Sequence, residues 1–247
     1  DSYAKELSYR YTVMVEAENA AVNTGILSRY PAYDVKAHRI SSGALDLGRY
    51  VVEARFLIDG VPLVVFNNHW KSKIGSEEET EILRIAAASL LCDRISSLLA
   101  SEPDLDIVVL GDLNESERDF PDSGASYHTA LVPLESEPEG GVDWPCILVA
   151  SDQILASVRK GRVVLYSPWK ESGEAGSYLY KDQWLAIDHA LSTPTLFDGE
   201  GFTFQGFSVF KAPFLLDADG SPRSYVRGSG YSDHLPILLS LSVEEAK

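Results

Sequence analysis

Polar side chains with catalytic potential stand at the ends of several apolar segments of this sequence. Asp112 and Asn114 follow one apolar run, and His69 follows another. Asp233 and His234 come directly before the last apolar run. A rigid sheet can hold polar side chains at its rim, and functional residues are often placed in this way. The sequence therefore predicts that these side chains serve one site.

The residue types suit hydrolysis of a phosphoester. The carboxylate of Asp112 can take a proton from water, and the amide of Asn114 can hydrogen-bond a phosphoryl oxygen or orient the water. Asp233 offers a hard oxygen ligand for a metal ion beside the imidazole of His234, which changes charge near neutral pH. Asp188 could fix the tautomer of that imidazole and stabilise its cationic form.

Each residue also has a structural interpretation when it is taken alone. Asp112 and Asn114 suit a turn or a helix cap, and His69 suits a hydrogen-bonded structural histidine. Asp188 could pair with the histidine that follows it, and Asp233 could belong to an ordinary turn. The ordered set Asn-x-His, Gly-Asp-x-Asn, Ile-Asp and Ser-Asp-His-x-Pro favours the catalytic interpretation.

Apolar runs and alternating patterns predict the elements that position these side chains. Strands are expected over Tyr9–Val15, Thr24–Ser28, Arg49–Ile58, Val61–Asn67, Ile107–Leu110, Val163–Tyr166, Trp184–Leu191, Phe202–Phe210 and Leu235–Val243. Helical spacing predicts one long helix over Glu77–Ala100, which Pro103 stops. The segment 115–144 is expected to form loops around a short helix. Strands with few, separated helices favour an α/β fold with two stacked sheets.

Bulk composition limits the possible classes of function. The 247 residues are 45% hydrophobic, which suffices for one sizeable core. This length permits one or two domains, and since α/β folds of this size are commonly single, one domain over residues 1–247 is expected. No run of about 18 apolar residues occurs, so no membrane span is expected. The net charge of −16 opposes tight nonspecific binding of nucleic acid, unless a metal ion or a local basic patch reverses the sign at the site. The five histidines lack the spacing of a zinc site, and two cysteines leave the compartment open.

Two motifs carry a resemblance to a known family. Gly111-Asp112-Leu113-Asn114 and Ser232-Asp233-His234-Leu235-Pro236 make the chain similar to the endonuclease/exonuclease/phosphatase superfamily, which includes deoxyribonuclease I-like nucleases. The resemblance extends from Gly25 to Ile237. The segment 67–73, Arg84 and the segment 176–180 resemble a bacterial branch of the family.

The resemblance implies a fold, an activity and a set of roles. The fold would be a two-sheet α/β sandwich of the deoxyribonuclease I type, incomplete at the N-terminus. The activity would be Mg²⁺- or Mn²⁺-dependent hydrolysis of a phosphodiester, as in a nuclease, with phosphomonoester hydrolysis second. The implied catalytic residues are His69, Asp112, Asn114, Asp188 and His234, the implied substrate contacts are Asn67, Lys71 and Lys73, and Asp233 would lie at the metal.

One feature of the family pattern is missing before Ser28. The family has an Asn and then a Glu of a Gln-Glu pair there, and that Glu is its main metal ligand; no such pair occurs here. We therefore expect an N-terminally truncated chain. The alternative is an inactive member that serves as a binding or scaffold module. Glu16 and Glu18 are either substitutes for the missing ligand or, as we prefer, part of a loop.

The expected partner is a phosphorylated substrate, either nucleic acid or a small phosphoester, and no obligate protein partner is indicated. Two alternatives stay open at this point. Arg29 and Arg84 either form structural ion pairs or contact phosphate. Tyr178, Tyr180 and Trp184 either stack on a substrate beside the cleft or pack within the core.

Overall fold

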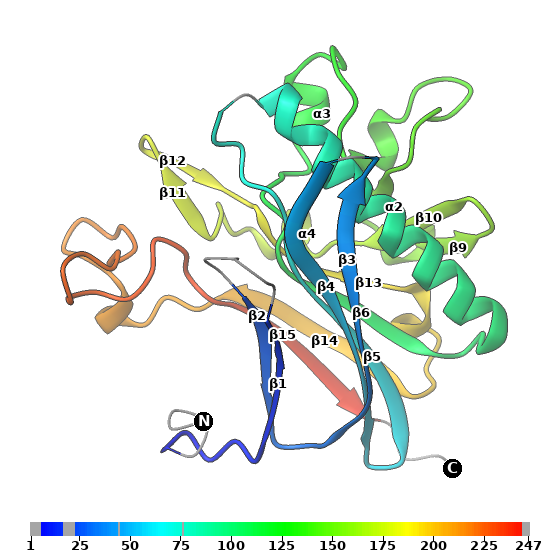
Figure 1. Cartoon of the computed structure of the whole chain (residues 1–247), viewed down its shortest axis with the longest axis horizontal. Helices are drawn as coiled ribbons and strands as arrows, with labels where there is room; N and C mark the ends of the chain where they lie inside the picture. The colour runs from blue at the N-terminus through cyan, green and yellow to red at the C-terminus, as the bar shows by residue number, and fades with distance from the viewer. Residues whose placement is uncertain (1–5, 17–22, 44, 76, 244–247) are drawn as a thin grey trace.

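The computed structural model describes residues 6–16, 23–43, 45–75 and 77–243. Its centre is a nine-stranded sheet in the order β3-β4-β5-β6-β13-β10-β8-β7, with β9 paired to β10 (Figure 1). The strands of this sheet are β3 (Ala32–Ser42), β4 (Leu45–Ile58), β5 (Val61–His69), β6 (Asp106–Asp112), β7 (Leu131–Pro133), β8 (Ile147–Ala150), β9 (Ser157–Arg159), β10 (Arg162–Tyr166) and β13 (Asp188–Ser192).

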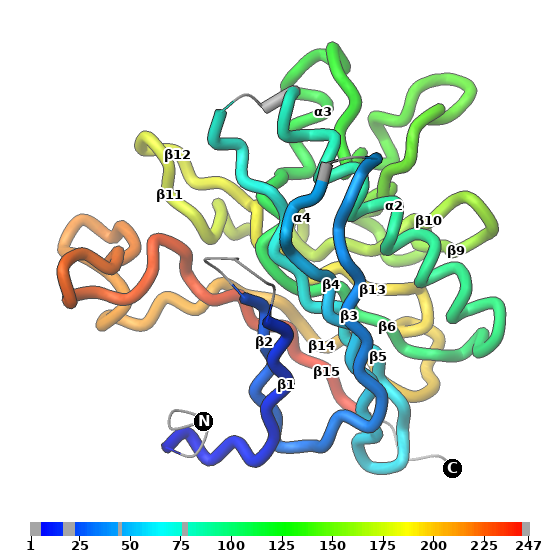
Figure 2. The backbone as a smooth tube through the Cα atoms, viewed as in Figure 1, coloured from blue at the N-terminus to red at the C-terminus, as the bar shows by residue number. Residues whose placement is uncertain are grey.

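Other strands lie outside this sheet. The pairs β1 (Tyr11–Val15) with β2 (Thr24–Ser28) and β14 (Phe202–Val209) with β15 (Ile237–Val243) are each antiparallel. Apolar side chains of β14 and β15 pack with Leu63 and Val108 of the central sheet. The N-terminal and C-terminal strand pairs are drawn on the same side of the central sheet in Figure 2, although they come from opposite ends of the chain. The fold is thus the expected α/β sandwich, and within the described residues its second layer consists of separate strand pairs.

The long helix α2 (Glu77–Ser101) covers the other face of the central sheet. Its buried residues Ala88, Leu91, Ile95 and Leu98 recur at helical spacing and belong to one hydrophobic cluster with buried residues of the central sheet. Ile82, an apolar residue near the start of the same helix, is 44% exposed. No helix in the described part of the chain is long and apolar enough to cross a membrane.

Two local expectations were wrong. The expected strand Trp184–Leu191 is divided into β12 (Gln183–Leu185) and β13, because β12 pairs with β11 (Tyr178–Tyr180) in a hairpin while β13 pairs with β6. The segment 115–144 contains the expected short helix, α3 (Asp119–Asp122), but also the buried strand β7. A continuous run of apolar residues predicts a strand, but it cannot show that the two halves of the run pair with different strands. The helix α4 (Trp169–Ser172) and the strand β8 are short, with four residues each.

A buried carboxylate joins the start of β6 to the start of β14. Asp106 is 2% exposed, and its Oδ2 accepts a hydrogen bond of 2.7 Å from the backbone nitrogen of Phe202. Its Oδ1 has no hydrogen-bond partner within the described structure. Burial raises the pKa of Asp106 from its ordinary value of 3.8 to about 7. The folded protein therefore keeps this proton at pH values where the unfolded chain has lost it.

We predict that Asp106→Asn stabilises the protein at pH 8 and has little effect at pH 4. Between the unfolded pKa of 3.8 and the folded pKa of about 7, the native protein loses stability as pH rises. The loss is up to about 1.4 kcal/mol per pH unit. Asparagine stays neutral, so a protein with asparagine at this position does not lose stability in this way as pH rises. Urea unfolding at the two pH values, with the exposed Asp104→Asn as control, measures this; an equal effect of Asp106→Asn at both would contradict it.

Candidate active site

The register of three neighbouring strands brings three of the predicted catalytic residues together. In the parallel pairing of β5 with β6, His69 is the partner of Asp112. In the antiparallel pairing of β6 with β13, Asp112 is the partner of Asp188. Asp112 therefore lies between the other two at one edge of the central sheet. Nε2 of His69 is 3.6 Å from Oδ2 of Asp112.

The fourth residue, His234, reaches this edge from the segment before β15. Its Nδ1 lies 2.8 Å from Oδ2 of Asp188, and the hydroxyl of Ser177 donates to the same oxygen at 2.5 Å. Burial alone would lower the pKa of His234, but the hydrogen bond and the charge of Asp188 outweigh burial and raise it. The arrangement holds the imidazole in one orientation, with Nε2 turned away from Asp188, and favours its cationic form.

The surroundings of Asp112 and His69 shift the pKa values of these two side chains in opposite directions. Burial, and then the charge of Asp188, raise the pKa of Asp112 to about 6. Burial, and then the positive charge of Arg49, lower the pKa of His69 to about 4. His69 is therefore neutral at pH 7, while Asp112 titrates near the range that suits a general base.

The turn after β6 holds Asp112 and Asn114 in a constrained geometry. Gly111 has φ +124°, and a Cβ there would lie 2.1 Å from the carbonyl oxygen of Asn68 on β5. Asn114 has φ +51°, and its backbone nitrogen donates to Oδ1 of Asp112 at 2.8 Å. The amide nitrogen of Asn114 donates to the carbonyl oxygen of Trp70 at 3.3 Å. The glycine permits close contact between β5 and β6, which brings His69 and Asp112 together.

A buried ion-pair network lies under this turn. Arg84 is 0% exposed and contacts carboxylates of Glu81 at 2.5 Å and Glu115 at 3.2 Å. It also donates to the carbonyl oxygen of Lys71 at 2.9 Å. The structural interpretation of Arg84 is therefore confirmed. Arg29 instead is exposed and lies 5.6 Å from the ring centre of Tyr9.

The predicted substrate contacts each have a partner inside the protein. The amide of Asn67 donates to the carbonyl oxygen of Gly25 at 2.8 Å and so joins β5 to β2. Lys73 forms an ion pair of 2.6 Å with Asp119. The ammonium of Lys71 contacts the backbone carbonyl oxygen of Ser72 at 3.2 Å. A substrate would have to compete with these contacts.

The residues that could hold a cation fit a divalent metal in part. Side-chain ligand atoms of Asp112, Asp188 and His234 lie within 4.8 Å of one another. After burial, the charge of Asp188 is the next contribution that raises the pKa of Asp112, and a bound cation would reduce this repulsion between the two carboxylates. Asp233, the predicted metal residue, is exposed and lies outside this group. Of the two N-terminal glutamates, Glu16 is exposed and Glu18 lies outside the described residues.

The aromatic residues near the site divide into two groups. Trp184 packs with Trp169, Val209 and Leu235 in a small apolar cluster, as the core interpretation predicted. Tyr178 stacks on His234, with ring centres 4.5 Å apart. A pocket of about 270 Å³ lies beside them; it is lined by Gly111, Asp188, Ser232, His234, Leu235, Pro236 and Ile237.

Two site residues escaped sequence analysis. Arg49 on β4 donates to the carbonyl oxygens of both His69 and Trp70, and its charge acts on His69 and Asp112. Ser177 is fully buried and orients Asp188. The alternating pattern around Arg49 indicates a strand but not its partner, and nothing in the segment 176–180 distinguishes Ser177 as a hydrogen-bond donor to Asp188.

Comparisons with known proteins agree with this fold. The sequence pattern of the Endonuclease/Exonuclease/phosphatase family matches residues 42–131, the segment with His69, Asp112 and Asn114. No curated protein matches the chain by sequence. An endonuclease/exonuclease/phosphatase family protein from Bacteroides thetaiotaomicron has a similar structure, with a TM-score of 0.57 and 15% identity, covering 97% of this chain and 78% of that one.

Two further solved structures are similar. TDP2 of D. rerio, complexed with a single-strand DNA product, has a TM-score of 0.54 and 12% identity, covering 98% of this chain and 82% of that one. The catalytic domain of human Nocturnin, with a bound sulfate anion, has a TM-score of 0.55 and 11% identity. The match covers 99% of this chain and 76% of that one. At these identities the structural likeness concerns the fold, while the sequence match concerns the family. Residues 42–131 are thus similar in sequence to the endonuclease/exonuclease/phosphatase family, and the chain has a fold like that of these solved structures.

Proposed function

We propose that this protein is a divalent-metal-dependent phosphoester hydrolase that acts on phosphodiesters, as a nuclease does. The observation that supports this most strongly is the meeting of Asp112, Asp188 and His234 at one sheet edge, with His69 beside them. The match of residues 42–131 to the Endonuclease/Exonuclease/phosphatase family and the similar fold of the solved structures support a phosphoester hydrolase. The DNA product bound to the D. rerio protein supports a nucleic-acid or nucleotide substrate.

Asp112 is proposed to orient and deprotonate the attacking water. Without a bound cation the pKa of Asp112 is about 6, so its carboxylate is ionised at pH 7 and can accept a proton. Asn114 is held against Asp112 by the 2.8 Å backbone hydrogen bond and supports the water or the scissile phosphate.

The two histidines are proposed to contact phosphate oxygens in different charge states. His234, which Asp188 fixes and whose cationic form Asp188 favours, would stabilise the charge that develops on phosphorus-bound oxygens. His69 is neutral, because its pKa is about 4, and would bind another phosphate oxygen or assist the leaving group as a hydrogen-bond donor. The transition state of phosphoryl transfer requires mainly positioning and positive charge, and this pair supplies both. Asn67, Lys71 and Lys73 stay predicted substrate contacts.

A cation, Mg²⁺ or Mn²⁺, is proposed to bind at the same edge. Asp112 and Asp188 would supply oxygen ligands and Asp233 would lie next to them, a donor set that suits these hard cations. The bound cation would neutralise negative charge on the phosphoryl group.

We expect the protein to hydrolyse bis-p-nitrophenyl phosphate in the presence of Mg²⁺ and to lose this activity in EDTA. Activity should return when excess Mg²⁺ or Mn²⁺ is added. Release of p-nitrophenol measures turnover, and p-nitrophenyl phosphate tests the phosphomonoesterase alternative. Absence of metal-dependent turnover on any phosphoester would favour the binding or scaffold module instead.

Metal binding can be measured without activity. Electron paramagnetic resonance of Mn²⁺ should show bound ion with the native protein and weaker binding with Asp112→Asn. Asp122→Asn, which changes an exposed carboxylate on α3, is the matched control. Equal Mn²⁺ binding by all three proteins would exclude Asp112 as a ligand.

A further inference from the structure

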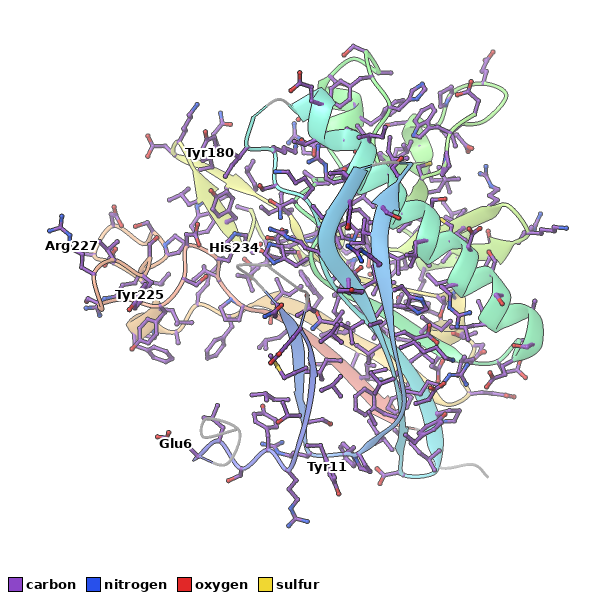
Figure 3. All side chains as sticks on the ribbon, in the orientation of Figure 1. Glu6, Tyr11, Tyr180, Tyr225, Arg227 and His234 are labelled. Atoms are coloured by element: carbon purple, nitrogen blue, oxygen red, sulfur yellow. The ribbon has the colours of Figure 1, made fainter. Side chains whose placement is uncertain are left out.

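The hairpin β11–β12 presents two tyrosine rings next to His234. Tyr178 stacks on the imidazole at 4.5 Å between ring centres, with 25° between the planes. Tyr180 follows on the same face of the strand, 6.2 Å from Tyr178 and tilted by only 16°. Tyr180 is 50% exposed. A continuous row of nearly parallel rings thus leads from the proposed phosphate contact to the solvent, on the side of the molecule where Figure 3 labels Tyr180 and His234.

The other face of this hairpin is anchored. Leu179 is the strand partner of Trp184, which packs into the cluster of Trp169, Val209 and Leu235. Backbone hydrogen bonds continue the connection, since Leu235 donates to Ser177 at 2.7 Å. The ring row therefore has a fixed base, and a ligand would meet rings whose positions are already set.

A lysine lies over the outermost ring. The ammonium of Lys181 is 5.0 Å from the ring centre of Tyr180. Lys181 and Asp182 form the turn between the strands with φ of +48° and +63°, which glycine or asparagine would adopt at lower cost. A flexible cation over an exposed ring can be displaced by a flat ligand and can then pair with an anionic group.

The charge of the protein makes this row important for binding. With a net charge of −16, long-range electrostatics oppose a polyanion, and Lys73, a predicted substrate contact, is paired with Asp119. Stacking on aromatic rings provides affinity that does not depend on net charge, and every nucleobase has a face that can stack.

We propose that Tyr180, with Tyr178 behind it, binds the nucleobase next to the scissile phosphate of a nucleotide phosphodiester. Lys181 leaves the ring when the base arrives and pairs with a phosphate oxygen. This inference rests on the proposed function, because it places the scissile phosphate at His234. The proposal assigns the substrate to phosphodiesters that carry a nucleobase, rather than to phosphoesters of sugars or polyols.

The test compares thymidylyl-thymidine with analogues in which either base is absent. We expect Tyr180→Leu to lower kcat/KM for thymidylyl-thymidine by about 5- to 100-fold, the loss of one stacked base. Tyr180→Phe should keep native activity because it keeps the ring. For the analogue that lacks the stacked base, kcat/KM of the native protein should already be low, and Tyr180→Leu should not lower it further.

The control is Tyr11→Leu, an exposed tyrosine on β1 that Figure 3 labels far from Tyr180; it should match the native protein. An equal loss for substrates with and without bases, or no loss at all in Tyr180→Leu, would overturn the proposal. If the native protein hydrolyses no phosphodiester, the proposed function fails. In that case, calorimetry can still measure the binding of thymidylyl-thymidine. Stacking on Tyr180 predicts that Tyr180→Leu binds this dinucleotide more weakly than Tyr180→Phe does.

Discussion

Asp112→Asn should lower kcat on bis-p-nitrophenyl phosphate by about 10²-fold or more, and His234→Ala should have an effect of similar size. Asparagine occupies the same space as Asp112 but cannot accept a proton from water. Alanine at 234 removes the group that Asp188 holds at 2.8 Å. Initial rates at saturating Mg²⁺ measure both effects.

The fold of these variants should persist. Asp112 is a half-buried carboxylate whose pKa is raised mainly by burial, so a neutral amide removes an unfavourable charge at pH 7 and above. Urea unfolding of the metal-free protein should therefore show no loss of stability in Asp112→Asn. His128→Ala removes an exposed histidine that stacks on Trp144, and it serves as the matched control for His234→Ala. Near-native activity in Asp112→Asn or His234→Ala would remove that residue from the mechanism.

Arg84→Met should destabilise the protein by about 3–5 kcal/mol, the usual cost of removing one partner from a buried ion pair. Arg84 lies on the helical face of α2 that packs on the sheet, and no part of its side chain is exposed. Without its charge, the carboxylates of Glu81 and Glu115 would face each other in the interior. Burial and the charge of Glu81 already raise the pKa of Glu115 while the arginine is present.

Urea unfolding at pH 7 measures this loss, and Arg118→Met provides the comparison. Arg118 pairs with Asp122 on the surface at 3.3 Å, and its side chain is 79% exposed. Exposed pairs of this kind contribute at most about 1 kcal/mol. If the two variants lost similar stability, Arg84 would not be the centre of the network. Because Glu115 follows Asn114 directly, we also expect Arg84→Met to disturb the turn that holds Asp112.

The candidate catalytic residues could be named from sequence because their motifs are local. Gly111-Asp112-Leu113-Asn114 and Ser232-Asp233-His234 are short, and each adjoins a strand that its own apolar residues predict. The long helix was predicted nearly to its observed bounds, since apolar spacing over many residues identifies a helix. Short strands such as β7 and β8 were missed, because a few apolar residues within a loop-rich segment have no distinctive pattern.

Sequence alone thus determined the long helix, several of the strands, the α/β class and the groups able to do chemistry, because each depends on neighbours along the chain; it did not determine strands such as β3, β7 and β8. Only the tertiary structure decided which groups meet. Strand register placed Asp112 between His69 and Asp188, burial shifted the pKa values of His69 and Asp112, and Arg49 comes from a strand with no motif. Register and burial arise from pairing between distant segments, and a local pattern contains no information about the partner.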